Sequence, residues 1–310
     1  IIIEETNLRA QKAELLGFKD WASYVMTSRM AQTTDNVYGI LDDLAPKAVE
    51  KAKAEAAAIQ KVINDSGESF ELKPWDWAFY AEKVRAEKYD LDPALVKPYF
   101  EMNSVIHDGL FFAMNKLYGI TFKERKDLPV YHEDVTAYEV FNADGSAIGL
   151  FYMDPYAREG KRGGAWMSAY VSQSGLKGTK PVIYNAQNIP KPAEGEPTLM
   201  TFDEVSTMFH EFGHAAHGLF SNVKYPSLAG TATARDFVEF PSQAHEDWMI
   251  EPTVLANYAK HYKTGEPIPQ ALLDKVLASQ KFNQGFGTTE YLAAALLDME
   301  WHSFGSEKKI

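Results

Sequence analysis

The segment from Thr201 to Leu219 constrains the fold of this 310-residue chain more than any other. Thr201 and Glu204 have the spacing of a capping box, in which each side chain hydrogen-bonds to the backbone of the other residue where a helix begins. Apolar residues then recur at helical spacing, at positions 205, 208, 209, 212, 216 and 219. Such a stripe is typical of a helix that packs one face against a core. We therefore expect an amphipathic helix over this segment.

The same segment contains the motif H-E-x-x-H as His210, Glu211 and His214. At about 100° per residue, the two histidines point within roughly 40° of each other, one turn apart. Both imidazoles can then reach a single metal ion through Zn–N bonds of about 2.0–2.1 Å. They lie roughly 140–180° from the centre of the apolar stripe, on a face that would normally carry Lys, Glu or Gln. The pattern predicts one bound Zn²⁺ per chain.

Glu211 directly follows the first of these histidines, on a side of the helix that can reach a water molecule at the metal without binding the metal itself. A zinc ion with three protein ligands keeps a fourth position for water and lowers the pKa of that water to about 7. We expect Glu211 to take the water's proton during attack on a peptide carbonyl and to pass it to the leaving amine. The alternative interpretation is an ordinary surface glutamate.

The motif leaves the third metal ligand open. The extended pattern H-E-x-x-H-x-x-G-x-x-H is excluded, because His217 occupies its glycine position and Phe220 its last histidine position. His217 lies seven residues, or roughly 10 Å along the helix axis, from His210, so we interpret it as a packing or supporting histidine. A carboxylate further along the chain is then required. The candidates are Asp236, Glu239, Glu246, Asp247 and Glu251.

Among these candidates, the surroundings of Glu239 favour it as the ligand. It lies between Val238 and Phe240, and a carboxylate buried among apolar residues needs a partner or a metal ion. The alternative is that Asp236 and Glu239 form a capping box for the next helix. The residues alone leave both interpretations open.

The rest of the chain predicts a mainly helical protein with a small embedded β-sheet. Residues 1–120 and 202–310 have helical patterns, with one helix expected to begin at Pro46 and another to cover Tyr99–Tyr118. Residues 130–188 contain strand patterns, including a hairpin whose turn is Asn142–Gly145. A further strand is expected at Gly164–Ser172. We favour an inner strand there over an edge strand that pairs with a peptide.

Composition narrows the possible partners. The chain has 31 basic and 43 acidic residues, a net charge of −12, and such a surface repels nucleic acid and anionic membranes. The sequence contains no cysteine, which excludes disulfides, thiolate metal sites and a cysteine nucleophile. No apolar run approaches the roughly 18 residues of a membrane helix. We expect a cytoplasmic protein, with the periplasm as the alternative, and the sequence leaves the oligomeric state open.

In these motifs, and in several further segments, the chain resembles the thimet oligopeptidase family (M3) of zinc metallopeptidases, and within it the bacterial peptidyl-dipeptidases. The resemblance covers essentially all 310 residues. The segments that carry it are Lys73–Trp77, Tyr156–Trp166, Pro181–Asn185, Phe209–His214, Ser227–Thr231, Arg235–Gln243 and Ala293–Asp298.

The resemblance implies a zincin-like fold of the neurolysin and peptidyl-dipeptidase type, with residues 1–310 forming part of one catalytic domain. It implies zinc ligands at His210, His214 and Glu239 and a general base at Glu211. It also implies a deep channel for short peptides from which C-terminal dipeptides are released. The alternatives are an oligoendopeptidase that cleaves within short peptides, or a fragment that binds zinc but is inactive.

The resemblance further leads us to expect a fragment. Relatives carry an additional N-terminal helical part, and a glycine- and tyrosine-rich loop that holds the substrate after the region matching Ile310. No tyrosine here matches that loop, and we expect Tyr291 in a core-like setting on a helix. The residues that bind the substrate therefore stay unassigned.

Overall fold

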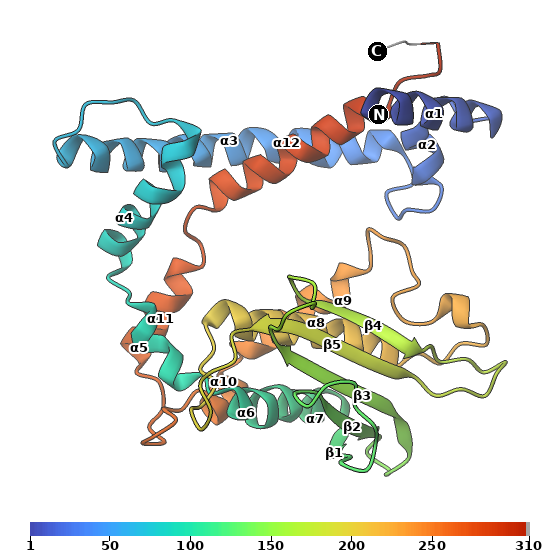
Figure 1. Cartoon of the computed structure of the whole chain (residues 1–310). Helices are drawn as coiled ribbons and strands as arrows, with labels where there is room; N and C mark the ends of the chain where they lie inside the picture. The colour runs from blue at the N-terminus through green and yellow to red at the C-terminus, as the bar shows by residue number, and fades with distance from the viewer. Residues whose placement is uncertain (308–310) are drawn as a thin grey trace. The chain divides into compact units, whose positions relative to one another are not determined.

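The computed structural model describes residues 1–307 of the chain (Figure 1). The chain divides into two compact units, one made of residues 1–91 together with the segment from Asp274 onward, and the other of Asp92–Leu273. Helices make up most of the described residues, and one five-stranded sheet lies in the second unit. This confirms the prediction of a mainly helical protein with a small embedded sheet. Among residues 1–307, no helix is both long enough and apolar enough to cross a membrane.

In the first unit, two long helices pack along each other. They are α3 (Thr34–Asp65) and α12 (Gln284–His302), and their shared core includes Leu41, Ala48, Leu292 and Met299. The side chain of Glu55 on α3 accepts hydrogen bonds from the backbone N–H groups of Gly285 and Phe286, at 3.0 and 2.8 Å, where α12 begins. The other helices of this unit are α1 (Ile2–Leu15), α2 (Trp21–Met26) and α4 (Trp77–Tyr89), with a 3₁₀ turn at Pro74–Asp76.

Two predictions about this unit are wrong. The helix expected to begin at Pro46 begins at Thr34, where the Thr33 hydroxyl accepts a hydrogen bond from the Asn36 N–H at 3.2 Å. Pro46 lies inside α3 on an exposed face, and the strong cap together with the apolar stripe outweighs its missing N–H. Tyr291 lies on α12 but is 76% exposed. Apolar residues occur on more than one side of this helix, and Leu292 and Met299 are buried in the core shared with α3 whereas Tyr291 is not.

The second unit contains the sheet and the remaining helices. The strands are β1 (Thr121–Glu124), β2 (Thr136–Phe141), β3 (Ala147–Tyr156), β4 (Trp166–Val171) and β5 (Val182–Ile189), in the order β1-β2-β3-β5-β4. Its helices are α5 (Pro93–Val96), α6 (Met102–Ser104), α7 (Phe112–Tyr118), α8 (Phe202–Leu219), α9 (Glu239–Glu246) and α10 (Pro252–Tyr258), with 3₁₀ turns at Lys97–Tyr99, Pro226–Leu228 and Asp247–Met249. Helix α11 (Gln270–Ser279) spans the boundary between the two units.

The predicted hairpin is confirmed, and two other elements differ from the predictions. Gly145 adopts φ of +81° in the turn between β2 and β3, and its N–H donates to the Asn142 carbonyl at 2.9 Å. The single helix expected over Tyr99–Tyr118 is instead α6, a π-helical segment (Val105–Phe111) and α7. Within that segment Gly109 lies so close to Tyr258 that an added Cβ would be 3.1 Å from the ring. Strand β1 was not predicted.

The prediction that Gly164–Ser172 forms an inner strand is also wrong. Strand β5 returns parallel to β3 and pairs with β4 on its other side, so β4 is left at the edge of the sheet. The sequence pattern of a single strand does not report its neighbours, because the order of strands depends on how the connecting segments cross. An edge strand presents unpaired backbone N–H and C=O groups along one side.

Helix α8 packs against one face of this sheet (Figure 1). Its predicted capping box is present, with Thr201 and Glu204 hydrogen-bonded to each other's backbone at 2.7 and 3.1 Å. Gly218 approaches the sheet so closely that an added Cβ would be 2.8 Å from side-chain atoms of Ile183 and Met167. Near the other end of the helix, Gln187 of β5 donates to the Glu204 carbonyl at 3.3 Å. The sheet therefore lies along the whole length of α8.

Candidate metal centre

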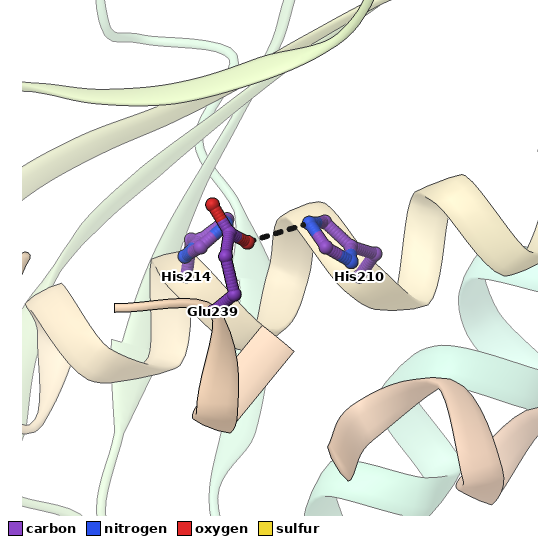
Figure 2. Close-up of side chains that lie close together, drawn as sticks. All are labelled: His210, His214 and Glu239. Atoms are coloured by element: carbon purple, nitrogen blue, oxygen red, sulfur yellow. Dashed lines mark ion pairs between the residues drawn. The ribbon is translucent and has the colours of Figure 1, made fainter. Parts of the chain in front are cut away.

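Helices α8 and α9 bring His210, His214 and Glu239 together (Figure 2). One carboxylate oxygen of Glu239, Oε2, lies 3.2 Å from His210 Nε2 and 3.0 Å from His214 Nε2. One ligand atom from each residue lies within 4.8 Å of those of the other two. Glu211 is on the same turn of α8 but does not belong to this group. The structure thus brings together the three residues predicted as metal ligands.

Helix α9 reaches this position because Gly213 lets it approach α8. A Cβ at Gly213 would lie 2.6 Å from Ser242 Cα and 2.9 Å from the Pro241 carbonyl oxygen, so any side chain there would push α9 away. The single hydrogen of the Ser242 hydroxyl is shared between two oxygens of Glu239, its carbonyl oxygen at 2.8 Å and Oε2 at 2.9 Å. Close packing and this hydroxyl therefore hold the Glu239 carboxylate over the two histidines.

The alternative capping box of Asp236 and Glu239 does not form. Helix α9 has Val238 at its N-cap, and no side chain of residues 1–307 caps it. Among the other carboxylates considered, Glu251 accepts hydrogen bonds from the backbone of Thr253 and Val254 and caps α10. Glu246 contacts His210 at its other ring nitrogen, with Oε1 2.7 Å from Nδ1. Glu246 was considered as a metal ligand from sequence, and its contact with Nδ1 was not foreseen.

The geometry of the three residues fits a small tetrahedral ion. Two ligands that each lie about 2.0–2.1 Å from one tetrahedral ion are about 3.3 Å apart. The two nitrogen-to-oxygen separations of 3.2 and 3.0 Å are close to that value. Two imidazoles and a carboxylate are also the donor set of many catalytic zinc sites. The residues present therefore fit a zinc ion with one position left for water or substrate.

The protonation of these side chains suits a metal ion. Burial lowers the pKa of His214, which favours the neutral imidazole that a metal requires. For Glu239, burial alone would raise the pKa, but the Ser242 hydroxyl and the two histidines outweigh it and the pKa is lowered. The carboxylate is therefore ionised at neutral pH.

Glu211 differs from the surface glutamate of the alternative interpretation, because it is only 6% exposed. One of its oxygens, Oε2, is buried and has no hydrogen-bond partner within residues 1–307. Burial, assisted by the negative charge of Glu239 and opposed by His210, raises the pKa of Glu211 to about 7. A carboxyl group with this pKa can both accept and release a proton near neutral pH.

This raised pKa leads to a prediction for the metal-free protein. Because the folded state prefers the protonated form, the stability linked to Glu211 is fully present below its ordinary pKa of 4.5 and is lost as the pH rises through about 7. The shift corresponds to roughly 3 kcal/mol. In the presence of a chelator, Glu211→Gln should therefore gain stability relative to the wild type between pH 5 and pH 8, as measured by urea unfolding. An equal difference at both pH values would contradict the raised pKa.

The position of His217 agrees with the interpretation of a packing or supporting histidine. It lies on the same face of α8, but it is not among the residues that could hold one ion together. Its Nδ1 is buried without a hydrogen-bond partner among the described residues, and burial lowers its pKa. Its ring contacts Phe237 edge-on, with centroids 6.4 Å apart.

The chain was compared with known protein families and with curated proteins. Residues 1–310 match the model of a family described as peptidase family M3. The chain belongs to this family. The match confirms the resemblance seen in the sequence, on which the expectation of a zincin-like fold rested.

Three relatives illustrate the similarity. The chain is 50% identical over 302 residues to a dipeptidyl carboxypeptidase of Escherichia coli (strain K12) and 47% identical over 302 residues to one of Salmonella typhimurium. It is 39% identical over 300 residues to oligopeptidase A of Escherichia coli (strain K12). These alignments cover 96–97% of this chain but only 44% of each relative. The chain thus spans less than half the length of these proteins.

Proposed function

We propose that the protein containing this chain is a zinc-dependent peptidase that hydrolyses short peptides. The observation that supports this most is the convergence of His210, His214 and Glu239 beside the buried Glu211. Membership of peptidase family M3 and the names of the relatives support the same activity. We propose His210, His214 and Glu239 as ligands of one Zn²⁺ ion per chain, and Glu211 as the general base.

A zinc ion bound by these residues would polarise a peptide carbonyl and lower the pKa of a water molecule to about 7. Glu211 accepts the proton of the attacking water through Oε2, which has no hydrogen-bond partner among the described residues, and then delivers it to the nitrogen of the leaving amine. Its raised pKa makes both transfers possible near neutral pH. The Ser242 hydrogen bond keeps the Glu239 carboxylate in place while this happens.

The free edge of β4 offers a binding place for an extended peptide. A hollow of about 270 Å³ lies between this strand, through Met167–Ala169, and the loop at 229–232. Gly218 of α8 also lines this hollow, which therefore borders the helix that carries the metal-binding histidines. A peptide could pair its backbone with the edge of β4, and the alternating side chains of the pair would then provide selectivity.

Buried charges hold the loop that leads into β4. Lys161 is only 4% exposed at its side chain, and its ammonium group donates to Asp154 Oδ1 at 3.0 Å and to the Tyr156 carbonyl at 2.7 Å. Arg158 forms two hydrogen bonds with the same carboxylate, at 2.6 and 2.8 Å. Every charge in this cluster is paired, which supports a fixed position for the start of the strand.

We propose release of C-terminal dipeptides as the mode of cleavage, because relatives with 50% and 47% identity are named dipeptidyl carboxypeptidase. Cleavage within short peptides is the second candidate, since oligopeptidase A is also a relative. The third candidate is a zinc-binding protein without turnover. The cytoplasm is the proposed compartment, which the lack of cysteine suits.

Matched peptides distinguish these candidates on the whole protein. We expect a short peptide with a free C-terminus to be cleaved two residues from that end, and the same peptide with an amidated C-terminus to be resistant. Mass spectrometry of the products measures both. Equal cleavage of the two peptides would favour the oligopeptidase mode instead. Turnover that survives a strong zinc chelator, or no turnover with zinc bound, would contradict a zinc peptidase.

A further inference from the structure

Helix α9 presents two glutamates to the same histidine. Glu239 and Glu246 are seven residues apart, so at about 100° per residue they lie on one face of the helix, within roughly 20° of each other. Glu239 Oε2 lies 3.2 Å from His210 Nε2, and Glu246 Oε1 lies 2.7 Å from His210 Nδ1. The imidazole of His210 is thus held between two carboxylates, one at each nitrogen.

The two contacts differ in chemistry. A neutral imidazole has one N–H group and one lone pair, and a metal ion binds the lone pair. Nε2 of His210 is the nitrogen that faces Glu239, so with a metal ion bound by the three residues Nε2 provides the lone pair and the hydrogen is on Nδ1. Nδ1 then donates to Glu246. Glu246 itself lies on the opposite side of the ring and is not in the group that could share one ion.

We propose that Glu246 is a positioning residue, which fixes the tautomer and the orientation of His210 for metal binding. This inference rests on the proposed zinc site. A carboxylate behind a histidine ligand orients the ring and increases its basicity, and loss of such a partner weakens metal binding by about 10–100-fold. The Glu246 side chain is 37% exposed, so solvent screens part of its charge, and its main effect is on orientation.

His214 provides an internal contrast. Its Nδ1 is buried and has no hydrogen-bond partner within residues 1–307, whereas Nδ1 of His210 has a carboxylate. The two histidines of the motif are therefore supported differently. Glu246 acts on one of them only, and its loss should distort the site instead of emptying it.

The test compares metal affinity among variants of the whole protein. Zn²⁺ affinity is measured by competition with a chromogenic chelator, and the visible absorption spectrum of the Co²⁺-loaded protein reports the ligand geometry. We expect Glu246→Ala to bind Zn²⁺ about 10–100-fold more weakly and to change the Co²⁺ spectrum. Glu246→Gln keeps an oxygen acceptor for Nδ1 and should fall between the wild type and Glu246→Ala. The control is Glu194→Gln, which removes a charge from an exposed position in the linker before α8 and should match the wild type.

The outcomes separate this inference from the proposed function. If the wild type binds no Zn²⁺, the zinc site itself fails. If the wild type binds Zn²⁺ and Glu246→Ala shows the same affinity and Co²⁺ spectrum, only the role of Glu246 is overturned. Thermal unfolding of the metal-free variants checks that they fold. If Glu246→Ala does not fold, Glu246→Gln decides, with weakened Zn²⁺ binding as the supporting result and wild-type affinity as the overturning one.

Discussion

Glu211→Gln is expected to abolish peptide hydrolysis while zinc stays bound. Glutamine has nearly the same shape as glutamate but cannot accept the proton of the attacking water. General acid–base catalysis by a positioned side chain contributes about 10²–10⁴-fold to a reaction rate, so turnover of the whole protein should fall by at least this range. The three proposed ligands are untouched, because Glu211 is not part of their group. Hydrolysis of a quenched peptide and zinc content by elemental analysis measure the two properties.

A control for this experiment lies on the same helix. Asp203 is exposed in the first turn of α8, and Asp203→Asn removes one negative charge without touching the site. We expect this variant to retain both zinc and turnover. Glu211→Gln with wild-type turnover would remove Glu211 from its proposed role. Loss of zinc from Glu211→Gln would instead show that this carboxylate supports the metal.

His214→Ala is expected to lose both zinc and activity. The variant keeps only His210 and Glu239, and two ligands hold zinc far more weakly than three. The loss of affinity should exceed the roughly 100-fold upper range for an outer partner such as Glu246. His214 is also 9% exposed in the structure, so its removal leaves a small cavity beside Glu239. Chelator competition and peptide hydrolysis test this prediction.

His217→Ala is the matched control for the loss of His214. It removes a histidine one turn further along the same face of α8, outside the group that could hold one ion. We expect zinc affinity to stay at the wild-type level in this variant. Tight, stoichiometric zinc in His214→Ala would refute the assignment of that residue as a ligand. Loss of zinc from His217→Ala would show that the site extends further along the helix than proposed.

Much of the fold could be predicted because its signals are local. The capping box of Thr201 and Glu204 and the turn at Gly145 depend on residues only a few positions apart, and both form as predicted. The wrong predictions concern residues whose environment depends on segments that are distant in the sequence. Tyr291 is exposed although Leu292, the next residue of α12, is buried, and Pro46 lies within a helix whose cap is 13 residues earlier, at Thr33.

The residues of the candidate site also fall into those predictable from local sequence and those that depend on distant segments. The positions of His210 and His214 relative to each other follow from the geometry of one helix, so the motif was sufficient to predict that they converge. Glu239 is 25 residues further along the chain than His214, and the residues alone favoured it among five candidate carboxylates without excluding a capping role. Its arrival at the histidines depends on Gly213, whose missing side chain lets α9 pack closely.

The sequence by itself determined the helix, its two histidines and the glutamate between them, because a regular helix fixes the directions of its own side chains. Only the tertiary structure decided that Glu239 faces Nε2 of His210, that Glu246 faces Nδ1, and that β4 is an edge strand. These relations join elements that are separate in sequence. They depend on packing between helices and on the order of strands in the sheet, for which the local pattern of residues carries no signal.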